Sequence, residues 1–308
     1  MTRRHLLLLS LALLGPIVLV VANPFAWGHR DEETRTPGPA EETCDTPTEA
    51  IAGSRPAHRW TDLEEGASID ATGAVWSGAD DWPVHVEGGA GLCWRGGEIV
   101  GTFADDVSWD DLHGTGAFNL FVPGATVSDL RIHNYGDGIR VLDDAHDFRI
   151  LDVHLSFVRD DCIENDDVRG GLVRSALLDG CYVAFSARPW QDDFAGDGSD
   201  RTWRIEDSLV RLEPMPTVYR GRAPGHGGFF KWDEHGRSPA LVLRGNVFRA
   251  DQDSNHTSMG IPAGTTCADN IMVWLGDGPY PEPLPDCFEI TTDPTVWDEA
   301  VANWRASR

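Results

Sequence analysis

The chain has 308 residues, a formal net charge of -25 and a hydrophobic fraction of 41%. That fraction is ordinary for a folded protein and allows a sizeable core. The acidity argues against nucleic acid as a partner, because binding phosphate needs a basic face. We expect a monomer whose charge mainly keeps it soluble.

Residues 1–26 have the features of an export signal. A positively charged segment, Thr2 to His5, precedes an apolar run from Leu6 to Ala22. The residues Val20-Val-Ala22 suit a small-residue cleavage site. The run is shorter than the roughly 20 residues of a membrane-spanning helix. The sequence therefore predicts a secreted or extracytoplasmic protein. Whether the segment is cleaved or stays as an anchor is open, and it is the only predicted contact with a membrane.

The rest of the chain divides into three predicted regions. Residues 27–60 are rich in Glu, Thr, Pro and Ala, which is typical of a disordered linker. Residues 61–265 carry a repeat, and we expect them to form the main body of the fold together with an N-terminal cap. Residues 266–308 are expected to form a C-terminal cap.

Five segments share a six-residue pattern with apolar first and sixth places. They are Val127-Ser-Asp-Leu-Arg-Ile132, Ile150-Leu-Asp-Val-His-Leu155, Val173-Arg-Ser-Ala-Leu-Leu178, Ile205-Glu-Asp-Ser-Leu-Val210 and Leu243-Arg-Gly-Asn-Val-Phe248. A sixth copy, Trp94-Arg-Gly-Gly-Glu-Ile99, opens the series. The first three of the five begin 23 residues apart, which is about one turn of a solenoid. Because one unit is too small to bury its own apolar side chains, the units must stack. The sequence predicts an all-β, right-handed parallel β-helix.

Two wider gaps between repeat starts indicate loops that leave the coils. One loop covers residues 189–200 and the other residues 213–226, and both carry an aromatic residue, charges and turn residues. Insertions in solenoids often gather on the binding face. We interpret them as walls of a sugar-binding cleft, with ordinary surface loops as the alternative.

A short helix is predicted near the C-terminus. Asp293 suits the N-cap and Pro294 the first helical position. The expected apolar stripe consists of Val296, Trp297, Val301 and Trp304. We expect this helix to cover the exposed strand edges of the last coil.

Six cysteines in an exported protein indicate disulfides. Cys267 and Cys287 flank a loop near the C-terminal cap and form the first expected pair. Cys162 and Cys181 lie on successive coils, where they either pair or stack. Cys44 and Cys93 remain and form the third expected disulfide.

Acidic residues recur about ten places after the repeat starts. Asp137 lies in one coil and the pair Asp160 and Asp161 in the next. Because coils stack at about 4.8 Å, these carboxylates should lie close together. Neighbouring acids raise one another's pKa and can divide into a general acid and a general base. Capping of turns by aspartate is the structural alternative.

These motifs resemble polygalacturonase-type glycoside hydrolases and, more loosely, pectate-lyase-like right-handed β-helix proteins. The resemblance rests on Asn134-Tyr-Gly-Asp137, Asp160-Asp161 and Gly225-His-Gly227, within about residues 115–250. It implies that Asp137, Asp160 and Asp161 are the catalytic carboxylates. The chain departs from the family where Phe229-Phe-Lys231 replaces Arg-x-Lys and where the Gly-His-Gly motif comes later than the next coil.

Three further residues are candidates for substrate binding: Lys231, Arg188 and His226. Lys231 is the only lysine of the chain. It could bind a substrate carboxylate or act as a base, or be a chance survivor on an outer strand. His226 lies in a loop, which favours a solvent-facing ring.

The leading hypothesis is an exported protein that hydrolyses a polysaccharide with a carboxylate cluster and without a cofactor. One alternative is a polysaccharide lyase with a Lys or Arg base, for which calcium would be the cofactor. The other is a β-helix that binds a glycan or a cell-surface partner without catalysis.

Overall fold

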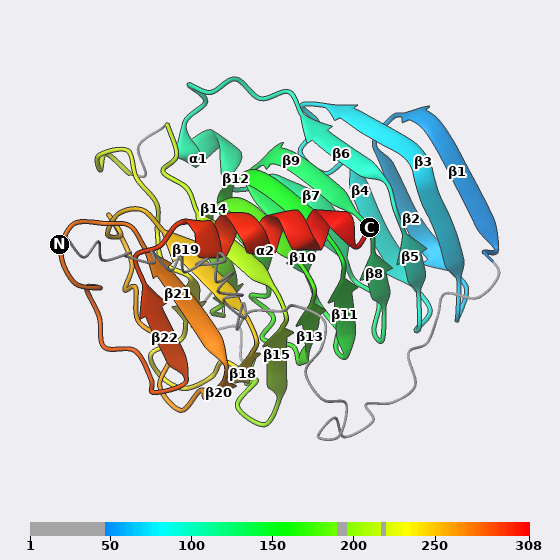
Figure 1. Cartoon of the computed structure of the whole chain (residues 1–308). Helices are drawn as coiled ribbons and strands as arrows, with labels where there is room; N and C mark the ends of the chain where they lie inside the picture. The colour runs from blue at the N-terminus through cyan, green and yellow to red at the C-terminus, as the bar shows by residue number, and fades with distance from the viewer. Residues whose placement is uncertain (1–46, 190–195, 217–219) are drawn as a thin grey trace, which may run out of the picture. The chain divides into compact units, whose positions relative to one another are not determined.

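The computed structural model describes residues 47–189, 196–216 and 220–308, all within the compact unit Ala40–Arg308. Every pairing between its named strands is parallel. Successive coils stack through three faces, which we call faces 1, 2 and 3 (Figure 1). Within the described part of the chain, no helix is long and apolar enough to cross a membrane. The expected parallel β-helix is confirmed.

The long strands β1 (Glu49–Arg55) and β3 (Ser68–Gly78) bend from face 1 into face 2. Face 1 continues through β5 (Cys93–Arg95), β8 (Thr126–Ser128), β11 (Phe148–Leu151), β13 (Gly171–Arg174), β15 (Thr202–Glu206), β18 (Ala240–Arg244) and β20 (Thr266–Ala268). Face 2 continues through β6 (Glu98–Gly101), β9 (Arg131–Tyr135), the first halves of β12 (His154–Glu164) and β14 (Leu177–Ala187), then β16 (Leu209–Leu212), β19 (Val247–Ala250), β21 (Asn270–Trp274) and β22 (Phe288–Thr291). Face 3 contains β2 (His58–Leu63), β4 (Val84–Gly88), β7 (Gly116–Leu120), β10 (Asp137–Val141), the second halves of β12 and β14, and β17 (Phe230–Trp232).

The third place of each repeat forms the corner between faces 1 and 2. The residues there have a positive φ: Gly96, Asp129, Asp152, Ser175, Asp207 and Gly245. Among L-residues, aspartate tolerates this left-handed conformation better than most, and glycine adopts it without strain. The corner therefore explains why the third place is Asp, Ser or Gly while the first and sixth are apolar.

Helix α2 (Thr295–Ala306) packs against the outside of face 2 and crosses its strands (Figure 1). Trp297 and Val301 are buried against Leu177, Leu209 and Val247, and Val296 and Trp304 pack at the margin. The helix and its apolar stripe are confirmed, and the Asp293 carboxylate accepts a hydrogen bond from the Thr295 N–H. The expected position over the last coil's edges is wrong, because the apolar outer surface lies on the side of face 2.

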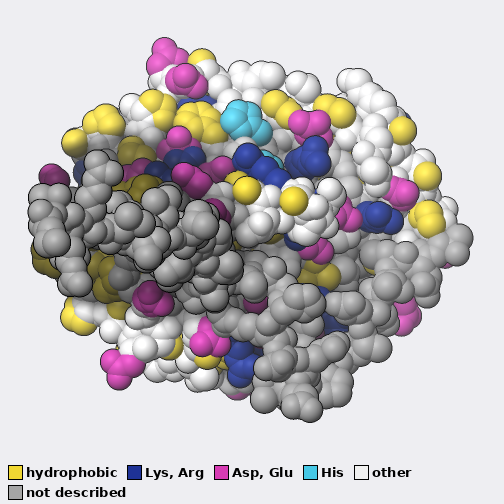
Figure 2. Space-filling model, in the orientation of Figure 1, with side chains coloured by type: hydrophobic (Ala, Val, Ile, Leu, Met, Phe, Trp, Pro, Cys, Tyr) yellow, Lys and Arg dark blue, Asp and Glu magenta, His cyan; other side chains and the backbone are white. Residues whose placement is uncertain are grey.

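Around α2, acidic and basic side chains are interspersed on the described part of this side of the molecule (Figure 2). Arg211 and Arg305 lie within ion-pair distance of Asp179, and Arg249 pairs with Asp251. Arg211, Asp179 and Arg249 are partly buried. On the part of this side that the structure describes, acidic side chains near the helix are thus paired with cations.

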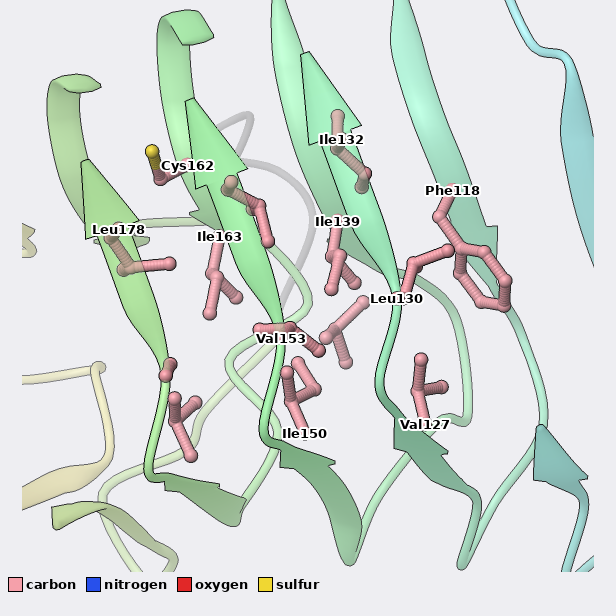
Figure 3. Packing of buried hydrophobic residues seen from close by; sticks show 14 of the residues in the cluster. Phe118, Val127, Leu130, Ile132, Ile139, Ile150, Val153, Cys162, Ile163 and Leu178 are labelled. Carbon is pink, nitrogen blue, oxygen red and sulfur yellow. The ribbon is translucent and has the colours of Figure 1, made fainter. Parts of the chain in front are cut away.

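The core is built from three apolar columns, one for each face (Figure 3). Face 1 contributes Ile69, Trp94, Val127, Ile150, Val173, Ile205 and Leu243. Face 2 contributes Trp76, Ile99, Ile132, Leu155, Leu178, Val210, Phe248 and Met272. Face 3 contributes Val84, Phe118, Ile139, Ile163, Phe185 and Phe230. All are buried, and each stabilises the fold by about 1.5–3 kcal/mol. The expected shared core of Ile132, Leu155 and Leu178 is confirmed.

The stack extends further at both ends than the repeat pattern indicated. Strand β1 and the start of β2 fall within the range expected to be linker, and β20, β21 and β22 fall within the expected C-terminal cap. These strands lack the full six-residue pattern but pair in register with regular neighbours. Pairing with a formed coil therefore extends the β-helix beyond its recognisable repeats.

Two of the three expected disulfides are present, Cys162 with Cys181 and Cys267 with Cys287. The first joins strands β12 and β14 inside the core, where both cysteines are buried. The second joins β20 to the segment before β22. The expected pairing of Cys93 with Cys44 lies outside the described residues, because Cys44 is not described.

Candidate functional site

The candidate site lies on face 3, in the column of residues that directly follow the apolar column. Register partners place these side chains on successive strands: Asn119, Arg140, Glu164, Ser186 and Lys231. Each neighbouring residue of the apolar column is buried in the core. Because side chains alternate along a strand, this charged column faces away from the core.

Three carboxylates converge beside this column. Asp137, Asp161 and Glu164 each have an oxygen within 4.8 Å of the others. The Asp161 backbone N–H donates to Asp137 Oδ1 over 3.1 Å. The expected stacking of Asp137 on the following coil is therefore what brings the acids together.

Two cations contact these carboxylates. Lys231 Nζ donates to Asp161 Oδ2 over 2.7 Å, and the Arg140 guanidinium donates to Glu164. Arg140 Nε also lies 3.5 Å from Asp137 Oδ2. Lys231 therefore belongs to the acidic cluster, on β17, which pairs with β14 at the end of face 3.

Asp160 contacts a different group from its neighbour Asp161. Its carboxylate lies close enough to Trp109, on the short helix α1 (Trp109–Leu112), for that side chain to lower the pKa of Asp160, although burial is the larger effect and raises it. Trp109 packs in a separate apolar cluster with Tyr182, Val183 and Met215. The three expected catalytic residues are thus close in space, but Asp160 lies beside α1.

Burial raises the pKa of the acids in the cluster. The pKa of Asp137 lies well above its usual range because of burial, and Glu164 and Asp160 raise it further. Burial also raises the pKa of Asp161, although Lys231 opposes that shift. Burial alone would lower the pKa of Lys231, but Asp161 and its acidic neighbours outweigh it and raise the pKa well above its ordinary value.

Asp166 is a further acid of the same cluster. Its Oδ1 accepts a hydrogen bond of 2.9 Å from the Ser186 hydroxyl. Burial, with Glu164 as the next cause, raises the pKa of Asp166 to about 7. The side chain is partly exposed, so Asp166 is an accessible carboxyl group that holds its proton near neutral pH.

Two buried oxygens of the cluster, Asp137 Oδ2 and Asp161 Oδ1, accept no hydrogen bond from the described residues. Asp137, Asp161 and Glu164 offer the hard oxygen ligands that calcium prefers, so their chemistry fits a cation. Arg140 and Lys231 already lie at ion-pair distance from all three carboxylates, however. A cation would have to compete with both.

The two other candidates for substrate binding are placed differently. Arg188 follows β14, is exposed, and lies near enough to lower the pKa of Asp161. His226 is fully buried, and its Nδ1 lies 2.7 Å from the Gly227 carbonyl oxygen. The expected solvent-facing ring of His226 is therefore wrong, because the Gly227 N–H donates to the Tyr182 carbonyl and so holds this segment against β14.

The asparagine of the family-like motif has a structural role. Asn134 has a positive φ, and its amide donates to the carbonyls of Gly101 and Phe103. Its side-chain oxygen accepts from Arg159, which also donates to the Ala104 carbonyl. Asn134 and Arg159 thus hold the loop before α1 and lie apart from the charged column.

Sequence reasoning missed Arg140, Glu164, Asp166 and Ser186 as site residues. The available signal was positional, because three of them directly follow a buried residue of the face 3 column. The repeat pattern was aligned on faces 1 and 2, and face 3 has no constant offset from it. Of the two insertions, residues 190–195 and 217–219 lie outside the described residues, so the expectation that they wall a cleft stays a prediction.

Comparisons with known proteins do not place the chain in a family: no family model, no curated protein and no solved structure matches it. The part of the resemblance that the structure supports is the architecture. The chain forms a parallel β-helix with an acidic cluster on face 3.

Proposed function

We propose that the chain is an exported, carbohydrate-active protein that hydrolyses a polysaccharide on face 3. The observation that carries the proposal is the cluster of acids beside Arg140 and Lys231, with one accessible carboxyl group whose pKa is about 7. Glycoside hydrolysis uses two carboxyl groups in different protonation states. The two disulfides support an oxidising compartment outside the cytoplasm.

In this proposal Asp166 donates the proton and Glu164 accepts one. Asp166 protonates the glycosidic oxygen as the bond to the anomeric carbon breaks. Glu164 removes a proton from the water that adds to that carbon. The Glu164 side chain is 11% exposed and Asp166 is partly exposed, whereas the side chains of Asp137 and Asp161 are 1% and 0% exposed. The expected acids Asp137 and Asp161 then act as positioning residues that hold Arg140 and Lys231.

A lyase that uses Lys231 as its base receives less support from the same geometry. A base must be deprotonated near the working pH. The pKa of Lys231 is raised well above its ordinary value, since Asp161, Asp160 and Asp166 favour its charged form. Lys231 is therefore suited to hold a carboxylate in place, and poorly suited to remove a proton.

The test is incubation of the purified protein with a panel of plant, algal and bacterial polysaccharides. New reducing ends identify hydrolysis, whereas an unsaturated product that absorbs in the ultraviolet identifies a lyase. We expect Glu164→Gln and Asp166→Asn each to lower turnover by about 10²-fold or more, because each removes a proton-transfer group with little change in volume.

Glu289→Gln and Asp286→Asn are the matched controls, since both carboxyl groups are exposed and lie near the last strand. They should leave turnover unchanged. Retention of full activity in both Glu164→Gln and Asp166→Asn would contradict the assignment of roles. Binding of a glycan without any product would instead favour a non-catalytic binding protein.

A further inference from the structure

A second feature of face 3 is an open pocket near the N-terminal end of the coils. It has a volume of about 380 Å³ and is lined by Ala57, His58, Arg59, Trp82 and His85. Trp82 is 51% exposed, which is unusual for so large an apolar side chain in this protein. Its Nε1 donates to the Gly114 carbonyl over 3.1 Å, so the ring is held at one edge while its face stays open.

The pocket and the acidic cluster share one line of strand partners. Arg59 pairs in register with His85, His85 with Asn119, and Asn119 with Arg140. At about 4.8 Å per strand, the pocket lies roughly 10–15 Å from Arg140. That distance suits a ligand of several sugar units that extends along the stack.

The charges at the cluster end of this line do not favour a polyanion. The acids Asp137, Asp160, Asp161, Glu164 and Asp166 outnumber the cations Arg140, Lys231 and Arg188 there. Arg140 and Lys231 already contact carboxylates. These two cations therefore have little attraction left for an acidic sugar.

The pocket offers contacts that a neutral sugar uses. The open face of Trp82 can pack against the apolar face of a sugar ring. Arg59 is exposed, and its guanidinium lies 3.5 Å from His85 Nδ1. Among the described residues, Arg59 has no carboxylate at ion-pair distance, so the N–H groups that do not face His85 can donate to hydroxyl groups.

We propose that the Trp82 pocket is a second binding site on face 3, and that it holds one end of an uncharged polysaccharide that reaches the acidic cluster. The inference rests on the proposed function for the other end of that ligand. It adds the substrate class, a neutral glycan, and a residue that selects for long chains, Trp82.

The experiment is affinity electrophoresis of the whole protein in gels that contain xylan, β-glucan, mannan or polygalacturonate. We expect retardation in at least one neutral gel and none in polygalacturonate. Trp82→Ala should weaken the neutral interaction about tenfold. Ile290→Ala is the matched control, because Ile290 is 49% exposed on the last strand, and it should bind as the unmodified protein does.

Three results would overturn the inference: no retardation in any neutral gel, preference for polygalacturonate, or unchanged binding by Trp82→Ala. The proposed function is tested separately. If hydrolysis occurs, Trp82→Ala should raise KM for long chains and leave kcat on short oligosaccharides unchanged, whereas Glu164→Gln lowers kcat on both. Trp82-dependent binding without hydrolysis would support the pocket and refute the catalytic proposal.

Discussion

Faces 2 and 3 belong to the same coils, yet their outer surfaces are completed in different ways. Outside face 2, Leu177, Leu209 and Val247 form an apolar column that α2 covers. Outside face 3, the corresponding column carries Arg140, Glu164 and Lys231. The core-facing columns are apolar on both faces.

The difference shows how one repeat serves two purposes. The inward positions are constrained by the shared core, while the outward positions are free to vary from face to face. A helix can cover an apolar outer column and bury it. Outward-facing charged side chains are instead neutralised by ion pairs with one another. Face 3 therefore contains buried charges, and these are costly unless they are paired.

Removal of α2 should have the largest effect on stability. A chain that ends at Pro294 exposes the apolar column of face 2, at a loss of about 1.5–3 kcal/mol for each large side chain. We expect Tm to fall by roughly 10 °C or more, with aggregation on heating. A chain that ends at Ala306 keeps the helix and is the control. An unchanged Tm without α2 would show that face 2 needs no cover.

Loss of the single lysine should have the next largest effect. Lys231→Met leaves the Asp161 carboxylate buried without its partner, which should destabilise the fold by about 3–5 kcal/mol in chemical denaturation. Addition of Asp161→Asn should recover much of that loss, because it removes the unpaired charge. The exposed Arg55→Met serves as a control for charge alone. Additive effects of the two substitutions would contradict the pairing.

The pH dependence of stability should distinguish face 3 from an ordinary salt-bridged surface. Burial raises the pKa of Asp166 to about 7 in the folded chain, above the ordinary aspartate value of about 3.9. The folded state therefore binds this proton more tightly than the unfolded state between those pH values. The contribution of this proton to the free energy of unfolding is largest below about pH 4 and declines as the pH rises toward 7.

We expect both Tm and the free energy of unfolding to be higher at pH 5 than at pH 8, and Asp166→Asn to reduce the difference in free energy by about 2 kcal/mol. Asp286→Asn is the exposed control. A Tm that rises steadily from pH 5 to pH 8 in both proteins would show that Asp166 is ionised in the folded state.

Calcium should have the smallest effect. Protons and the two cations already neutralise the cluster, so chelation should leave Tm and hydrolysis unchanged. The measurement is thermal unfolding with a chelator and with millimolar calcium. A clear rise of Tm with calcium, lost in Asp137→Asn, would show that the carboxylates are ion ligands instead.

The fold could be predicted because its signal is repeated. Each copy of the repeat, such as the one that starts at Val127, places one residue in each of the same two apolar columns and one at the same corner. The ends of the stack could not be predicted, since β1 and β20 depend on pairing with regular coils. Tertiary pairing overrides a weak local pattern in such strands.

The site could be predicted only in part. Equal offsets placed Asp137 beside the pair Asp160 and Asp161, and the rarity of lysine singled out Lys231. Glu164 and Arg140 could not be selected, because charged side chains are usual on outward strand positions. The burial of His226 was also hidden, because the path of the preceding loop is set by contacts distant in sequence.

The register of the coils fixes the spacing of side chains along face 3. Each coil adds one side chain to every column, so the separation between two positions changes only in whole steps of about 4.8 Å. Deletion of the complete coil that contains Asn119 would bring His85 one step closer to Arg140 without altering either residue. The length of ligand that spans the two sites is thus set by the number of coils between them.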